Sequence, residues 1–96
     1  MNSDYITEIA IDSEGRLLVF PASNTYPMIY REAVEVHWDS DGRFLYSPKP
    51  REWTYLHWFQ HIINIAGGLV LGPNTKWTNV PDELKMEIEA WMTQRK

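Results

Sequence analysis

The longest amphipathic pattern in the chain runs from Arg51 to Ala66 and predicts a central helix. At about 100° per residue, its apolar side chains fall in one arc of roughly 180°. They are Tyr55, Leu56, Trp58, Phe59, Ile62, Ile63, Ile65 and Ala66, and only Trp53 breaks the partition. This arc is wider than the ~100° stripe of an ordinary surface helix, so we expect contacts with two neighbours, a sheet and another helix. Pro50 is expected near the first helical position and Gly67 at the stop.

Before this helix, the chain alternates between apolar and polar residues in a way typical of two β-hairpins. Strands are predicted at 5–11 and 16–20 around one turn, and at 30–38 and 43–46 around another. Both turns read Asp-Ser-x-Gly-Arg, a sequence suited to tight turns. Residues 22–29 are predicted as a loop and 81–94 as a second helix. The segment 69–71 fits either an edge strand or a packed loop.

This order of elements predicts one α+β domain spanning residues 1–96. We expect a four- or five-stranded antiparallel sheet built from the two hairpins. The central helix covers one face of the sheet, and the second helix lies at the C-terminal end. Replacement of Phe59 by Ala is expected to be strongly destabilising, because this residue lies in the middle of the apolar arc.

The expected strand pairing, with Ile11 opposite Arg16 and Trp38 opposite Arg43, divides the sheet into two faces. The face toward the helix collects Ile9, Ile11, Leu18, Phe20, Val34, Val36, Trp38 and Leu45. The other face is too apolar to be left to solvent. We predict that it binds a second copy of the chain, with its own 22–29 loop or another partner as alternatives. The candidate binding residues on it are Leu17, Val19, Glu35, His37, Phe44 and Tyr46.

Composition narrows the classes of partner and compartment. The formal net charge is -4, from 13 acidic and 9 basic residues, and basic residues do not cluster, so nucleic acid is not expected as a partner. The chain has no cysteine, which excludes disulfides, thiolate catalysis and Cys-type zinc sites. It also lacks a membrane-length apolar run and a recognisable signal sequence. We therefore expect a cytoplasmic protein that does not bind membranes.

Two groups of residues could carry chemistry. His57 and His61 are spaced i and i+4 on the polar arc of the helix, a spacing that can hold a metal. Two solvated histidines are the alternative that we favour, so no metal is expected. Glu35, His37 and Tyr46 could perform acid–base chemistry. No nucleophile motif or phosphate-binding loop accompanies them, so a protein without enzymatic activity and without a cofactor is favoured over an enzyme.

Two stretches rich in aromatic residues, Tyr30–Asp39 and Glu52–Phe59, carry a resemblance. In size, acidity and aromatic content the chain resembles the small orphan proteins of bacterial integron mobile gene cassettes, and it is similar to immunity-type proteins that neutralise a toxin. The resemblance implies a compact α+β domain, often oligomeric, that binds rather than catalyses. It assigns no functional residue.

Three functions remain open from the sequence. The first is a binding or interaction protein that forms a homodimer through the mixed sheet face. The second is a small-molecule-binding protein with an aromatic pocket between sheet and helix, in which Glu35, His37 or Tyr46 is a polar anchor. The third is a minor metal-dependent or acid–base enzyme. Trp53 and Trp77 could belong to a binding surface or to the core.

Overall fold

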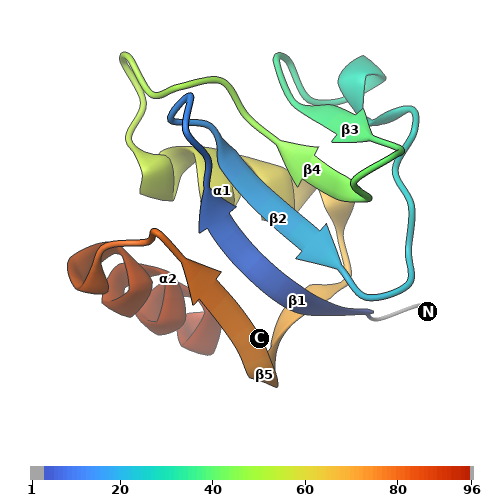
Figure 1. Cartoon of the computed structure of the whole chain (residues 1–96). Coiled ribbons are helices and arrows are strands. Elements are labelled where there is room, and N and C mark those ends of the chain that lie inside the picture. Colours follow the sequence, from blue (N-terminus) through green and yellow to red (C-terminus); the bar gives the residue numbers. More distant parts are fainter. Residues whose placement is uncertain (1–3, 96) are drawn as a thin grey trace.

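The computed structural model describes residues 4–95 and shows a five-stranded sheet with two helices on one of its faces (Figure 1). The elements are β1 (Asp4–Ile11), β2 (Leu17–Pro21), the short 3₁₀ helix η1 (Ile29–Arg31), β3 (His37–Asp39), β4 (Phe44–Tyr46), α1 (Tyr55–Ala66), β5 (Leu69–Thr78) and α2 (Asp82–Gln94). The strand order is β3-β4-β2-β1-β5, and every neighbouring pair is antiparallel except β1 and β5, which are parallel. The predicted α+β class is confirmed, with a mixed sheet in place of a wholly antiparallel one.

Helix α1 begins at Tyr55, later than the sequence pattern suggests. Thr54 is its N-cap, and the Thr54 hydroxyl accepts a hydrogen bond from the backbone N–H of His57 at 3.2 Å. The predicted stop at Gly67 is confirmed, because this residue has a φ of 70° and its N–H bonds to the carbonyl of Ile63.

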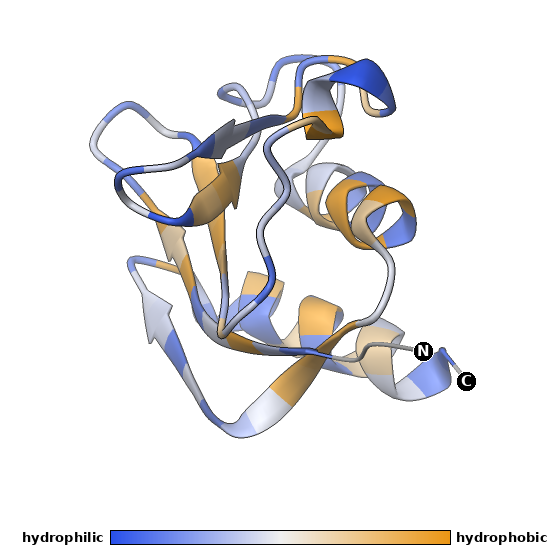
Figure 2. Cartoon of the chain, turned by 90° about the vertical axis from the view of Figure 1, so that its right-hand side faces the viewer, coloured by the Kyte–Doolittle hydropathy of each residue, from blue (hydrophilic) through white to orange (hydrophobic). Residues whose placement is uncertain are grey.

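The wide apolar arc of α1 packs on two neighbours, as predicted. One is the sheet, and both helices lie on the same side of it (Figure 2). The other is α2, whose Trp91 meets the ring of Phe59 edge-on with centroids 6.0 Å apart. Phe59, Ile62 and Ile88 are wholly buried between these layers, so the core lies between the sheet and the two helices.

The first hairpin pairs one residue away from the predicted register. Ile11 lies opposite Leu17, and Ile9 opposite Val19. The reason is the turn: Asp12 and Arg16 close it through a backbone hydrogen bond, and Gly15 adopts a φ of 83°. A three-residue loop with a left-handed glycine replaces the expected four-residue loop. A shift of one residue exchanges the two faces of a strand, so the predicted placement of Leu17 and Val19 on the outer face is wrong.

The predicted strand at 30–38 is also wrong for most of its length. The chain forms η1 and further turns, and only His37–Asp39 is extended. Ile29, Ala33 and Val36 are buried, whereas Val34 is 75% exposed. The buried positions follow the i, i+4, i+7 spacing of a helical turn, and not the alternation of a strand. The consequence is that Val34 and Glu35 lie on the surface, away from the sheet.

The second hairpin differs from the prediction by two residues, which preserves the faces. His37 lies opposite Tyr46, and Trp38 opposite Leu45. Arg43, with a φ of 62°, makes the left-handed turn here. The two turns therefore close differently although their sequences match. His37, Phe44 and Tyr46 lie on the outer face, as predicted.

Strand β5 resolves the question left open for residues 69–71. It runs parallel to β1 at the edge of the sheet, but the pairing jumps from Ile6–Leu71 to Glu8–Lys76. The hydroxyl of Thr75 spans the interruption: it accepts from the N–H of Gly72 at 2.8 Å and donates to the carbonyl of Ile6 at 2.6 Å. The segment 69–71 is thus the first part of a long, interrupted edge strand.

The loop that follows β2 is fastened to the start of β1. The buried Asp4 carboxylate accepts hydrogen bonds from the backbone N–H groups of Ser23 and Asn24, each at 2.9 Å. Burial alone would raise the pKa of Asp4, but the backbone hydrogen bonds outweigh it and hold the pKa below its ordinary value. The loop runs past the edge of the sheet and leaves the outer face open (Figure 1).

Candidate functional site

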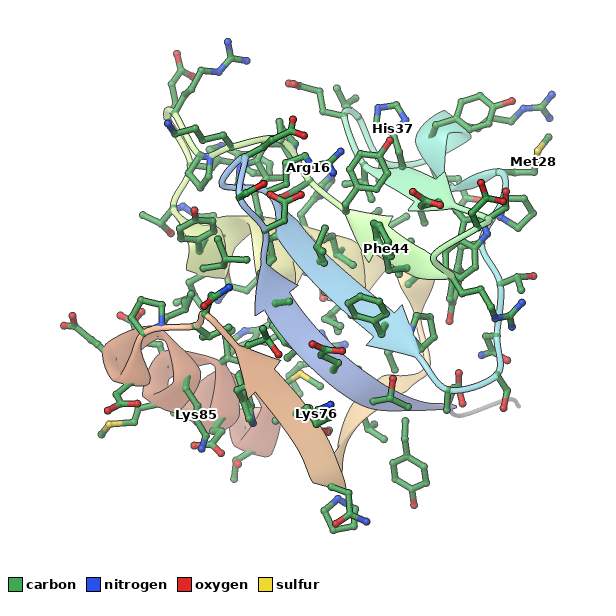
Figure 3. The ribbon with its side chains drawn as sticks, in the orientation of Figure 1. Arg16, Met28, His37, Phe44, Lys76 and Lys85 are labelled. Carbon is green, nitrogen blue, oxygen red and sulfur yellow. The ribbon has the colours of Figure 1, made fainter. Side chains whose placement is uncertain are left out.

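The outer face of the sheet carries a row of contacting rings. Phe44 lies between Phe20 and Tyr46, with centroid distances of 5.0 and 5.8 Å, and His37 lies 5.5 Å from Tyr46. The guanidinium of Arg16 covers the Tyr46 ring at 4.7 Å. Figure 3 shows Arg16, His37 and Phe44 on this open face. These residues form the aromatic face of the sheet, to which the predicted Glu35 does not belong.

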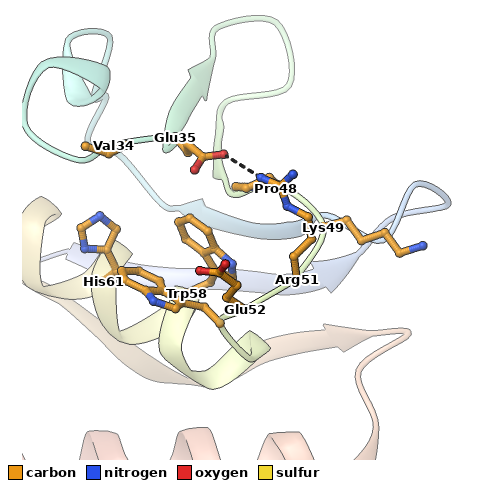
Figure 4. Close-up of a pocket in the computed structure, with 9 residues that line it drawn as sticks. Val34, Glu35, Pro48, Lys49, Arg51, Glu52, Trp58 and His61 are labelled. Atoms are coloured by element: carbon orange, nitrogen blue, oxygen red, sulfur yellow. Dashed lines mark ion pairs between the residues drawn. The ribbon is translucent and has the colours of Figure 1, made fainter.

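A cleft lies at the opposite end of α1 from its glycine stop, and three separate segments build it (Figure 4). The turn between η1 and β3 contributes Val34 and Glu35. The loop between β4 and α1 contributes Pro48, Lys49, Arg51, Glu52 and Trp53, and α1 contributes Trp58 and His61. The cavity volume is about 610 Å³, within the range of about 300–1,000 Å³ found for small-molecule sites.

Three rings make the floor and one wall of this cleft. The Trp53 ring lies 4.8 Å from that of Trp58 and 5.3 Å from that of His61, and Trp58 and His61 are 6.0 Å apart. Trp58 and His61 are held by one turn of α1, because residues at i and i+3 are neighbours on a helix. Trp53 precedes the helix and is 43% exposed. The aromatic wall therefore combines two rings on a rigid element with one on an irregular segment.

Charged side chains of both signs surround the mouth of the cleft. Arg51 and Glu35 form an ion pair at 3.8 Å across it, drawn as a dashed line in Figure 4. Their side chains are 79% and 49% exposed, so solvent screens the pair and it adds little to stability. Lys49 and Glu52 complete the set. The two cations and two carboxylates balance, so the rim has no net charge.

The backbone of Glu35 is in the left-handed region, with a φ of 66°. A residue with a side chain pays roughly 1–2 kcal/mol for this conformation, which glycine adopts freely. Such strain often accompanies functional sites. The residue in this conformation is a glutamate and not a glycine, so a carboxylate lies beside the mouth of the cleft.

The indole nitrogen of Trp58 has no hydrogen-bond partner. Among the described residues it is the buried side-chain polar atom left unsatisfied, and the residue as a whole is 8% exposed. A buried indole N–H ordinarily finds an acceptor, and each exception calls for an explanation. A residue that lines the cleft thus carries a buried donor without a partner in the described chain.

The two histidines considered as metal ligands lie close to Trp53 instead. Its ring is 6.1 Å from His57 and 5.3 Å from His61. Residues 4–95 contain no group of three or more His, Asp or Glu side chains placed to hold a metal ion. In the same range, no helix has the length and apolar character needed to cross a membrane.

Several cleft residues are not among those that the sequence pattern selects. Arg51 and Trp58 line the cleft but are not candidates from the sequence. Glu35, Trp53 and His61 are candidates, as a binding residue, a possible binding-surface residue and a possible metal ligand in turn, but the sequence does not bring them together. Trp53 is the one residue that does not fit the division of the predicted helix into an apolar and a polar arc. That misfit is the signal in the sequence that it lies outside the helix. The remaining predicted residues divide between the aromatic face, with His37, Phe44 and Tyr46, and the core, with Leu17 and Val19.

Comparisons with known proteins agree on one family. The family model described as Integron Cassette Protein Hfx_Cass5 matches residues 4–70. A solved structure described as "Structure from the mobile metagenome of North West Arm Sewage Outfall: Integron Cassette Protein Hfx_Cass5" is 45% identical, over 97% of this chain and 98% of that one, with a TM-score of 0.51. No curated protein matches the chain. The resemblance drawn from the sequence to integron cassette proteins is thereby confirmed, and the chain belongs to the Hfx_Cass5 family of integron cassette proteins.

Proposed function

We propose that the protein binds a small molecule in the cleft formed by the η1–β3 turn, the β4–α1 loop and α1. The observation that carries this proposal is a cavity of about 610 Å³ walled by Trp53, Trp58 and His61. Apolar walls with a few convergent polar groups are typical of ligand sites. Here the polar groups are the Arg51–Glu35 pair at the mouth and the unused Trp58 N–H.

The distribution of exposed apolar side chains favours the cleft over the aromatic face. Val34 and Trp53 are among the large hydrophobic residues left exposed, and both line the cleft. On the aromatic face, Phe20, Phe44 and Tyr46 are only partly exposed, and Ala10 and Leu18 beside them are 6% and 8% exposed. On that face the rings shield one another and the smaller apolar residues beside them. In the cleft, by contrast, the side chains of Val34 and Trp53 remain in contact with water.

A fragment screen followed by amide chemical-shift mapping tests this proposal. With a library of aromatic and aliphatic fragments, we expect the shifted amides to cluster at residues 34–35, 49–53 and 58–61. Replacement of Trp53 by Ala is expected to weaken the binding of these fragments about five- to thirtyfold, since removal of one aromatic wall from a ligand site costs about 1–2 kcal/mol of binding free energy. The matched control is Phe44→Ala on the aromatic face, which is expected to leave them unchanged. Fragments that bind elsewhere, or equal affinity in the Trp53 variant, would contradict the proposal.

A second candidate function is self-association through the aromatic face. It is supported by the row formed by Phe20, Phe44, Tyr46 and His37, which no helix or loop of the described chain covers. Sedimentation over a dilution series is expected to give a dimer for the parent and a monomer for Phe44→Asp, because a charge at the centre of a two-fold interface meets its own copy. A monomeric parent at all concentrations would exclude this function and leave the cleft proposal untouched.

A further inference from the structure

We infer that the ligand of the cleft is a neutral, planar aromatic molecule that carries a carbonyl acceptor beside its ring, and that this carbonyl accepts a hydrogen bond from Trp58 Nε1. This inference rests on the proposed function and specifies its ligand class. Three independent features of the cleft lead to it: the ring geometry, the unused donor and the charge balance of the rim.

The ring geometry selects a flat aromatic partner. Trp53 and Trp58 meet at an angle of 52°, and His61 stands nearly perpendicular to Trp53 at 81°. The three rings therefore present faces and edges in several directions around one small volume. Aromatic molecules match such walls well, because offset stacking and edge-to-face contacts are both favourable for them. A saturated ring of equal size is thicker and cannot make these contacts.

The unused donor selects a hydrogen-bond acceptor on the ligand. Trp58 Nε1 is shielded from water and makes no hydrogen bond within the described chain, and leaving a buried donor unpaired is costly. The Trp53 ring packs on the Trp58 ring with centroids 4.8 Å apart, is 43% exposed and precedes the N-cap of α1. In the inferred complex the exposed Trp53 ring moves aside, and the carbonyl of the ligand reaches the Trp58 N–H and accepts its hydrogen bond.

The charge balance selects a neutral molecule. Lys49 and Arg51 are offset by Glu35 and Glu52, and Arg51 is already paired with Glu35. A charged ligand would be attracted by the two rim residues of opposite charge and repelled by the two of the same charge. A neutral carbonyl compound avoids this conflict and uses the rim only through its ordinary hydrogen bonds.

Four small probes separate these features: benzamide, cyclohexanecarboxamide, toluene and benzoate. Benzamide contains the ring and the neutral acceptor, and each of the others lacks one feature. The readout is the indole N–H resonance of Trp58, assigned by NMR in the parent protein, together with the affinity of each probe. We expect benzamide to bind most tightly and to shift this resonance downfield, while toluene, which has no acceptor, produces no downfield shift. The other probes are expected to bind at least about fivefold more weakly than benzamide.

Replacement of Trp58 by Phe keeps a ring and removes the donor. It is expected to weaken benzamide about five- to tenfold and to leave toluene unchanged. If this variant does not fold, the Trp58 resonance in the parent still decides the question. Binding of cyclohexanecarboxamide or benzoate as tight as that of benzamide, or an unmoved Trp58 resonance in the benzamide complex, would overturn the inferred ligand class but leave the cleft as a binding site. Absence of binding by every probe and every library fragment would instead refute the proposed function.

Discussion

Replacement of Leu17 by Asp is expected to prevent folding. Leu17 is wholly buried in the core between the sheet and α1. The change removes a large apolar side chain, which costs about 2–5 kcal/mol in a core, and it leaves a carboxylate without a partner in an apolar environment. Together these effects approach the whole stability of a small domain, about 5–15 kcal/mol. Far-UV circular dichroism and a urea titration at neutral pH measure the outcome.

Phe44→Asp is the matched control, since it places the same charge on the other face of the sheet. Phe44 is half-buried and packs on Phe20 and Tyr46. Removal of this ring packing is expected to cost about 1–3 kcal/mol, so the variant stays folded. If the register inferred from sequence were correct, both residues would lie on the outer face and both variants would fold. A cooperatively folded Leu17→Asp protein would therefore contradict the observed register.

Replacement of Phe59 by Ala is expected to lower the free energy of unfolding by about 3–5 kcal/mol. The Phe59 side chain is wholly buried where α1 meets the sheet and α2, and the substitution also removes its edge-on packing against Trp91. The cavity cannot be filled easily, because rigid elements surround it on both sides. Urea denaturation gives the difference directly.

The comparison for Phe59 is Met86→Ala on α2, where the side chain is 66% exposed. Both substitutions introduce alanine into a helix, so helix propensity contributes little to the difference between their changes in unfolding free energy. The Met86 variant is expected to lie within about 0.5 kcal/mol of the parent. A decrease below about 1 kcal/mol at Phe59 would place its ring outside the core and would contradict the two-sided packing of α1.

The helices were predictable from the sequence because their signals are local. The apolar arc of α1 and the stop at Gly67 depend on residues within one element. The register of each hairpin depends on which residue of its turn adopts the left-handed conformation. In the first turn this residue is Gly15, and in the second it is Arg43, one position further along the shared turn sequence. Closely similar turn sequences therefore close differently, so the turn sequence by itself does not determine the register.

The cleft was less accessible to prediction because it joins segments that are distant in the chain. Glu35 and Arg51 meet only because η1 and its turns replace the expected strand. The buried set Ile29, Ala33 and Val36 carries the helical spacing that signals this, but Val34 and Val36 mimic strand alternation equally well. In this segment two periodicities overlap, and tertiary packing chooses between them.

The interruption in β5 has a consequence for growth of the sheet beyond one molecule. An unpaired edge strand offers its backbone groups to other chains and invites aggregation. In β5 the jump in pairing between Leu71 and Lys76 breaks the regular row of backbone donors and acceptors, and Pro73 within it has no N–H to offer. Thr75 holds this irregular shape through its hydroxyl. Extension of the sheet by a neighbouring copy is thus disfavoured along this edge, which protects an otherwise long strand from polymerisation.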